Sequence, residues 1–160
     1  MSSVEVRAGV NADFPLWQEW TRKLFDSDGR FDPDFNQDWP DEPAGREYFA
    51  TVIQSGILLF AERDGRVLGF LDGTLHEANA TTSILRAEIT QIFVERESRR
   101  QGVGNALVAQ FAGWCRQRSV KSMVVGVFDA NREAVAFYRS LGLAPWIVRL
   151  SGAPEQVLGG

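Results

Sequence analysis

The fold is decided by the stretch Arg99-Arg100-Gln101-Gly102-Val103-Gly104-Asn105, which separates a predicted strand from a predicted helix. Residues 87–94 before it are rich in β-branched and aromatic side chains, as strands are. After it, Leu107, Phe111 and Trp114 recur at helical spacing. The two glycines let the backbone approach a ligand, and the helix start offers free N–H groups to an anion. The stretch therefore predicts a phosphate-binding loop.

Several kinds of loop bind phosphate, and their spacing distinguishes them. A P-loop needs Lys followed by Ser or Thr after its glycines, and that pair is missing. A dinucleotide-binding loop needs a third glycine, where this chain has Leu107. The pattern R-x-x-G-x-G remains, beginning at Arg99. Taken alone, it leaves open a glycine-rich turn with two solvated arginines.

A second segment, residues 127–143, contains Asn131, Ala134, Phe137 and Tyr138 at the spacing N-x-x-A-x-x-F-Y. Together the two segments resemble the signatures of the GCN5-related N-acetyltransferase (GNAT) family, in the same order. Leu143 stands where that family usually has Phe, which is an apolar exchange. The resemblance extends from the first strand to about residue 150.

The composition is typical of one globular domain. The chain has 160 residues, of which 44% are hydrophobic and 24% charged. We expect a single domain over residues 1–150 and a loosely ordered tail over 151–160. No apolar run is long enough to span a membrane, and the N-terminus lacks a secretory signal pattern.

The net charge and the small number of Cys and His side chains restrict the ligands that we expect. The net charge of −4 makes nucleic acid an improbable ligand. A single cysteine, Cys115, excludes an internal disulfide and fits the cytoplasm; we interpret it as a small hydrophobe rather than an acyl carrier. Since His76 and Cys115 are the only His and Cys, no metal site is expected.

The alternation of patterns indicates an α/β fold. The resemblance implies the three-layer α/β/α acetyltransferase fold, with a mixed, splayed central sheet and about four helices. A helix is expected to begin at Asn11 or Asp13 and run through Leu24, followed by a loop over residues 25–43. A strand over 120–127 is expected to be buried on both faces. The other expected elements are strands at 4–7, 57–62, 66–75, 88–94 and 144–150, and helices at 44–54, after 102 and after 131.

The resemblance implies that acetyl-CoA is the acyl donor. Its pyrophosphate would lie on backbone N–H groups of the loop, and its pantetheine arm would lie along the 88–94 strand. The N–H of Ile92 would then polarise the thioester carbonyl. The implied coenzyme-binding residues are Ile92, Phe93, Val94, Arg99, Arg100, Gln101, Gly102, Val103, Gly104, Asn105, Asn131 and Tyr138.

The resemblance also implies catalytic roles. Glu88 occupies the position of the glutamate base in histone acetyltransferases of the family, although other members use an ordered water or another carboxylate. Strand alternation would place Glu88 on the same face as Ile92 and Val94. Tyr138 is the implied general acid toward the coenzyme A sulfur. Asn131 is expected to cap its helix and also to contact coenzyme A.

The acceptor is expected to be a primary amine that attacks directly in a ternary complex: a small basic amine, an aminoglycoside-like or polyamine-like molecule, or a lysine or the N-terminus of a protein. Residues 25–43 hold seven acidic side chains against Arg30 alone, so their field would attract a cation. Asp32, Asp34, Asp38 and Trp39 are the candidate acceptor contacts, and a solvated acidic loop is the alternative. A non-catalytic acyl-CoA sensor, an interaction scaffold and a homodimer also stay open.

Overall fold

The computed structural model describes residues 2–159, whose contacts form two compact units that divide after Gly126. The first unit holds the sheet and three long helices; the second begins at Val127. The expectation of a single domain over residues 1–150 stays a prediction. Among the described residues, no helix is long and apolar enough to cross a membrane.

The first unit contains a mixed five-stranded sheet in the order β1-β2-β3-β4-β5. The first four strands form an antiparallel meander, and β5 pairs parallel to β4. Asp64 and Gly65 have positive φ angles and form the expected tight turn between β2 and β3. The strands are β1 (Glu5–Ala8), β2 (Ile57–Arg63), β3 (Arg66–His76), β4 (Arg86–Val94) and β5 (Ser122–Val125).

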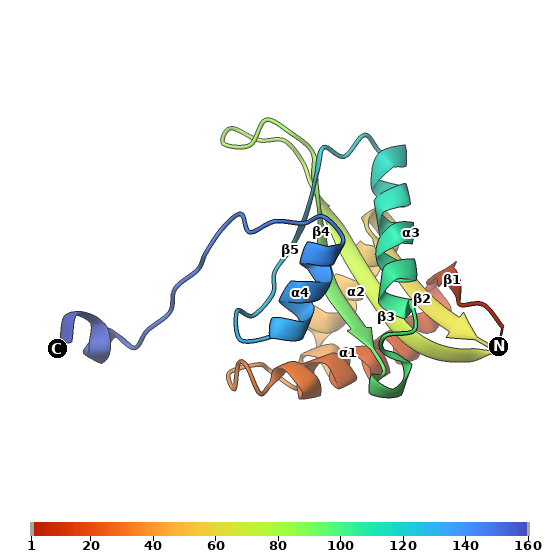
Figure 1. The fold of residues 1–160 in the computed structure, drawn as a ribbon, viewed down its shortest axis with the longest axis horizontal. Coiled ribbons are helices and arrows are strands. Elements are labelled where there is room, and N and C mark those ends of the chain that lie inside the picture. Colours follow the sequence, from red (N-terminus) through yellow and green to blue (C-terminus); the bar gives the residue numbers. More distant parts are fainter. Residues whose placement is uncertain (1, 160) are drawn as a thin grey trace. The chain divides into compact units, whose positions relative to one another are not determined.

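Helices cover both faces of this sheet, as Figure 1 shows for α1 (Phe14–Asp28), α2 (Pro43–Ser55) and α3 (Val103–Gln117). On one face, aromatic residues of α1 and α2 pack with Phe70 of β3. On the other, Gly73 of β3 leaves room for the Phe111 ring of α3: a Cβ at residue 73 would lie 2.5 Å from that ring. This arrangement confirms the three-layer prediction.

The acidic segment differs in part from the expected loop. Residues 25–28 form the last turn of α1, and Trp39–Asp41 forms a 3-10 turn. Asp13 occupies the position before α1, but its carboxylate does not cap that helix. It accepts the Val10 N–H at 2.8 Å and pairs with Arg7 instead.

A β-bulge in β4 overturns the expected alternation. Asp72 of β3 lies opposite Gln91, whereas the next residue, Gly73, lies opposite Ile89, so Thr90 is the extra residue. Glu88 faces Thr74 and Ile92 faces Leu71 across the ladder. Because Thr74 and Leu71 are three residues apart on β3, they point to opposite faces. Glu88 is therefore not on the face of Ile92 and Val94.

The last strand of the sheet is shorter and less buried than expected. β5 covers only Ser122–Val125, and all four residues are half-buried. The prediction of a strand buried on both faces over 120–127 is wrong, because β5 is the edge strand of the sheet. Its ladder with β4 runs from Arg86↔Ser122 to Ile89↔Val125. The sheet therefore splays beyond Ile89, as the resemblance implied.

In the second unit, α4 (Arg132–Ser140) is the expected helix. Asn131 caps it: its Oδ1 accepts the Ala134 N–H at 3.2 Å, which confirms the predicted cap. The expected strand at 144–150 is absent from the described chain, where these residues are irregular. A strand needs a ladder partner, and a propensity for strand does not supply one. Pro154–Gly159 forms 3-10 turns.

Candidate active site

The predicted phosphate loop lies between β4 and α3. Gly102 immediately precedes α3 and has a φ of 83°, in the left-handed region that favours glycine. A Cβ at this residue would meet open space, so the backbone conformation, not crowding, requires the glycine. As the residue at the N-cap position of α3, Gly102 has no side chain with which to cap the helix. Its first N–H groups are therefore available to an anion.

Neighbouring side chains hold the loop in place. Arg99 Nε donates to the Val94 carbonyl at 3.1 Å, which fixes the end of β4 against the loop. Gln101 accepts from Arg63 Nη1 at 3.0 Å and donates to the Glu97 carbonyl at 2.7 Å. The remaining loop residues continue the turn into the helix: Arg100 has a φ of 62°, Val103 is buried, and Gly104 and Asn105 lie in the first turn of α3.

The three candidate coenzyme contacts on β4 lie beyond the end of the β4–β5 ladder. Ile92, Phe93 and Val94 pair with β3 on one side. On the other side the pairs with β5 stop at Ile89. The second half of β4 thus supplies a strand edge, which the 3-10 turn Arg96–Ser98 connects to the phosphate loop. The contact of this edge with a pantetheine arm stays a prediction.

Glu88 forms an exposed pair with the histidine of the neighbouring strand. His76 Nε2 and Glu88 Oε2 are 2.8 Å apart, and both side chains are partly exposed. The bulge turns Glu88 toward the face covered by α1 and α2, since Thr74 and Asp72, the partners of Glu88 and Gln91, share that face.

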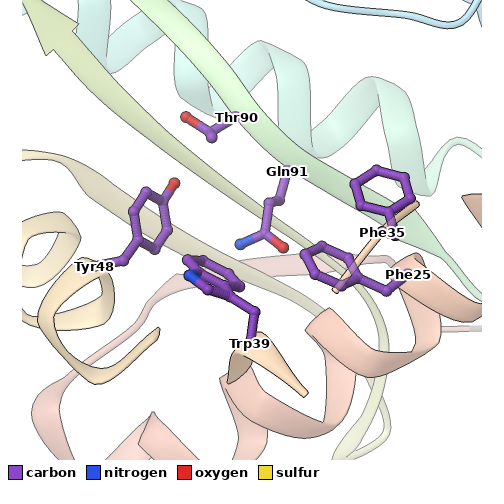
Figure 2. Close-up of a pocket in the computed structure, with 6 residues that line it drawn as sticks. All are labelled: Phe25, Phe35, Trp39, Tyr48, Thr90 and Gln91. Carbon is purple, nitrogen blue, oxygen red and sulfur yellow. The ribbon is translucent and has the colours of Figure 1, made fainter. Parts of the chain in front are cut away.

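On that same face a cavity of about 260 Å³ opens, mostly between aromatic rings (Figure 2). Three rings come from the segment that the sequence marked as acidic, and Tyr48 comes from α2. The bulge lets two consecutive β4 residues face the cavity. The lining residues are Phe25, Phe35, Trp39, Tyr48, Thr90 and Gln91.

Trp39 is thus the one predicted acceptor residue that lines the cavity. Asp32, Asp34 and Asp38 are not among its lining residues. The Asp32 carboxylate accepts the Asp34 N–H at 3.0 Å, which folds it onto its own turn. Asp34 and Asp38 are exposed.

Behind the cavity, Asp72 is fully buried in β3 and collects three neutral donors. Trp17 Nε1 donates to Oδ2 at 2.9 Å and Gln91 Nε2 to the same oxygen at 2.6 Å. The Tyr48 hydroxyl donates to Oδ1 at 2.8 Å. Burial raises the pKa of Asp72 to about 6, although the three hydrogen bonds lower it. Burial and the nearby Asp72 charge raise the pKa of Tyr48 well above its ordinary value.

Asp72, Tyr48 and Gln91 are functional candidates that were not predicted from the sequence. A usable signal was present, because Asp72 follows Leu68-Gly69-Phe70-Leu71 and Gln91 stands between Ile89 and Ile92. A polar residue inside an apolar strand at a buried position needs hydrogen-bond partners. Two partners of Asp72, Trp17 and Tyr48, come from α1 and α2, and the pattern within a strand cannot identify residues of a helix.

Two further residues considered in the sequence, Tyr138 and Cys115, are buried in helices. Tyr138 is buried in α4, and its ring lies 5.2 Å from that of Phe137. Cys115 is buried in α3, where burial raises the pKa of its thiol to about 11. A thiol so rarely ionised suits the interpretation of Cys115 as a small hydrophobe.

Residues 17–143 match the sequence model of the acetyltransferase (GNAT) family. The chain belongs to this family. This GNAT chain is 32% identical to mycothiol acetyltransferase of Salinispora tropica over 93 residues, which are 58% of the chain and 30% of that protein. It is 29% identical to N-acetyltransferase 8 of Homo sapiens over 82 residues, 51% of the chain and 36% of that protein. The matches thus cover about a third of these relatives.

Solved structures share the fold. A mutant of the BH1408 protein from Bacillus halodurans superimposes with a TM-score of 0.81 at 16% identity, covering 93% of this chain and 98% of that one. Aminoglycoside N-acetyltransferase AAC(6')-Iy in complex with CoA gives a TM-score of 0.74 at 19% identity, covering 96% and 97%. At these identities the likeness establishes the GNAT fold.

Proposed function

We propose that this GNAT chain is an acetyl-CoA-dependent N-acetyltransferase that acetylates a primary amine by direct attack in a ternary complex. One observation carries the proposal: the second half of β4, beyond its ladder with β5, is followed after the 3-10 turn Arg96–Ser98 by the Gly102 loop and the start of α3. A strand edge followed by an anion site matches a ligand with an amide-bearing arm and a pyrophosphate.

In this proposal the donor is held mostly by backbone. The N–H groups of Gln101, Gly102, Gly104 and Asn105 bind the pyrophosphate, and the edge of β4 from Ile92 to Val94 binds the pantetheine arm. Arg99 and Arg100 add positive charge. The N–H of Ile92 stabilises the oxyanion of the tetrahedral intermediate, an interaction worth about 2.7–4 kcal/mol in other enzymes.

Glu88 is the proposed base. An alkylamine has a pKa of about 10.4 and is mostly protonated at neutral pH, so a proton acceptor is needed. The bulge supports the assignment, because it places Glu88 on the face of the aromatic cavity. His76, at 2.8 Å, orients the carboxylate through their hydrogen bond.

Tyr138 is the proposed hydrogen-bond donor to the departing thiolate. An unperturbed thiol has a pKa of about 8.5 and tyrosine one of about 10, so complete proton transfer is uphill. A hydrogen bond that strengthens as negative charge develops on sulfur supplies the stabilisation. Asn131 is proposed to contact coenzyme A beside its role as helix cap.

We also propose a cytoplasmic protein that forms a homodimer. The single, buried cysteine supports the compartment. Exposed apolar side chains at residues 146–150, such as Val148 with 78% and Leu150 with 93% of its surface exposed, support a partner surface. Size-exclusion chromatography with light scattering tests the dimer.

The activity is tested by thiol release from acetyl-CoA with a panel of primary amines. We expect turnover by the wild-type protein and a fall in kcat of about 100-fold or more in Tyr138→Phe. Acetyl-CoA should also raise the midpoint of thermal unfolding, since 100 Kd of a specific ligand stabilises by about 2.7 kcal/mol. Tight coenzyme binding without turnover of any amine, and with an identical mutant, would instead establish a sensor.

A further inference from the structure

The cavity beside Asp72 presents aromatic faces, the Gln91 side chain and the hydroxyl groups of Tyr48 and Thr90 to an occupant. The Tyr48 hydroxyl and the Gln91 amide both direct their donors at the Asp72 carboxylate. The Tyr48 oxygen also has Thr90 as a hydrogen-bond partner, so the group left for a ligand is the Gln91 carbonyl oxygen, which can only accept. The complementary ligand group therefore carries N–H or O–H donors.

The Gln91 carbonyl oxygen is the observation that points to a ligand. Gln91 lines the cavity and is only 5% exposed, yet its Oε1 has no hydrogen-bond donor among residues 2–159. Figure 2 shows this oxygen turned toward the Phe25 ring. A buried acceptor without a donor is costly, and a ligand N–H would satisfy it.

The orientation of this amide follows from Asp72. A carboxylate accepts hydrogen bonds and cannot donate them, so the Gln91 Nε2 must face Asp72, at 2.6 Å. The reverse orientation would place two acceptor oxygens against each other. Asp72 thereby determines that Gln91 presents its carbonyl oxygen, and not its NH2 group, to the cavity.

The charge of the surroundings favours a cation. The three side chains that donate to Asp72 are all neutral, so its negative charge has no cationic hydrogen-bond donor among them. The aromatic walls are continuous: Phe25 and Phe35 stack at 4.9 Å, and Trp39 lies 5.2 Å from Tyr48. Ring faces attract an ammonium group, more strongly where water is excluded.

Two further features define the ligand. A volume of about 260 Å³ is below the usual range for drug-sized ligands, so the cavity holds one end of a molecule. An environment that favours a cation also raises the pKa of the bound amine and opposes its deprotonation. The amine in the cavity is therefore not the nucleophile.

We propose that this cavity binds a second, non-reacting ammonium group of the acceptor, so that the preferred substrates carry at least two amino groups. Gln91 Oε1 accepts an N–H of that group, and the rings of Trp39 and its neighbours face its charge. Asp72 is a positioning residue that orients Gln91 and Tyr48. The inference rests on the proposed function in treating the ligand as the acceptor.

Three probes of matched length test the assignment; each has a primary amine at one end, and they differ at the other end. In 1,5-diaminopentane the far end is an ammonium, in 5-amino-1-pentanol it is neutral, and in (5-aminopentyl)trimethylammonium it is charged without an N–H. Because each primary amine is itself protonated at neutral pH, the far ends are compared by kcat/KM for thiol release, in which the reacting amine lies at the thioester; calorimetric titration measures diamine binding alone. We expect kcat/KM of the diamine to exceed that of the alcohol about tenfold.

The variants separate the two contributions. Gln91→Leu should lower kcat/KM of the diamine about tenfold and leave that of the trimethylammonium probe within about twofold, because the far end of the diamine can donate to Gln91 and a quaternary ammonium cannot. Trp39→Leu should lower kcat/KM of both the diamine and the trimethylammonium probe, whereas Trp39→Phe keeps an aromatic face and most of that kcat/KM. Glu47→Gln removes an exposed charge of α2 and should change nothing. Circular dichroism and thermal unfolding verify that each variant is folded.

Opposite results overturn the inference. Equal kcat/KM of the wild-type protein for diamine and alcohol would do so, as would an equal fall for the diamine and the trimethylammonium probe in Gln91→Leu. Cation preference that disappears only when Asp32, Asp34 and Asp38 are replaced by Asn would assign recognition to the acidic segment. A different outcome would refute the acetyltransferase proposal and support the cavity proposal. In that outcome the diamine binds in calorimetry, its binding depends on Gln91, and no thiol is released.

Discussion

The loop at residues 99–105 and the cavity beside Asp72 use the chain in opposite ways. The loop is seven consecutive residues, and what it presents to a ligand is backbone, set by the left-handed Gly102 and the open start of α3. The cavity takes side chains from α1, α2, β4 and the segment between the helices. A site built from backbone tolerates most side-chain changes, whereas a site built from convergent side chains depends on each of them.

The largest expected effect is at the buried carboxylate. Asp72→Ala leaves Trp17, Tyr48 and Gln91 without their acceptor, so we expect a loss of about 3 kcal/mol in the free energy of unfolding. Relief from burying a charge offsets part of the loss. Urea unfolding measures it, with the shape-conserving Asp72→Asn as the milder control. Equal stability of Asp72→Ala and the wild type would show that the network does not organise the cavity.

The pH dependence of stability sharpens the same point. The pKa of Asp72 is raised from 3.8 to about 6, so between these values the native state binds more protons than the unfolded state. The contribution of Asp72 to stability is therefore fully present below about pH 4 and falls as pH rises to about 6, by about 2–3 kcal/mol.

Comparison with Asp72→Asn isolates this contribution. The stability of the wild type relative to Asp72→Asn should decline across pH 4 to 6 and stay constant above pH 7. Asp13 acts with the opposite sign, because hydrogen bonding to Arg7 lowers its pKa, but both proteins contain it. A difference that rises with pH would mean that Asp72 is stabilised as a carboxylate.

The smallest effect is expected for glycine-to-alanine substitutions at the loop and in the helix after it. The substitution should lower stability at Gly102 and raise it at Gly113. Gly102→Ala forces a Cβ into the left-handed region and should cost about 1–2 kcal/mol, with several-fold weaker acetyl-CoA binding. Gly113→Ala, in the interior of the same helix with room for a Cβ, should stabilise by about 0.5–1 kcal/mol. Thermal unfolding with and without acetyl-CoA measures both. Unchanged affinity of Gly102→Ala for acetyl-CoA would show that the conformation of Gly102 does not contribute to donor binding.

Most of the first unit was predictable because its patterns are local. The strand–loop–helix around Gly102, the turn at Asp64-Gly65 and the helix over 43–55 each follow from a few adjacent residues. The two wrong strand predictions, at residues 120–127 in the first unit and 144–150 in the second, have one cause. A strand needs neighbours, and apolar composition states neither which edge is covered nor where a ladder ends.

The sequence by itself determined the GNAT family, the order of the sheet and helices, and the loop proposed to hold the donor, since each is written in consecutive residues. Only the tertiary structure decided the face of Glu88, because a single extra residue at Thr90 reverses the alternation of β4. It also decided the cavity beside Asp72, because Trp17, Tyr48 and Gln91 meet at Asp72 from three different elements. Hydrogen bonds between elements far apart in the chain carry no periodicity along the sequence.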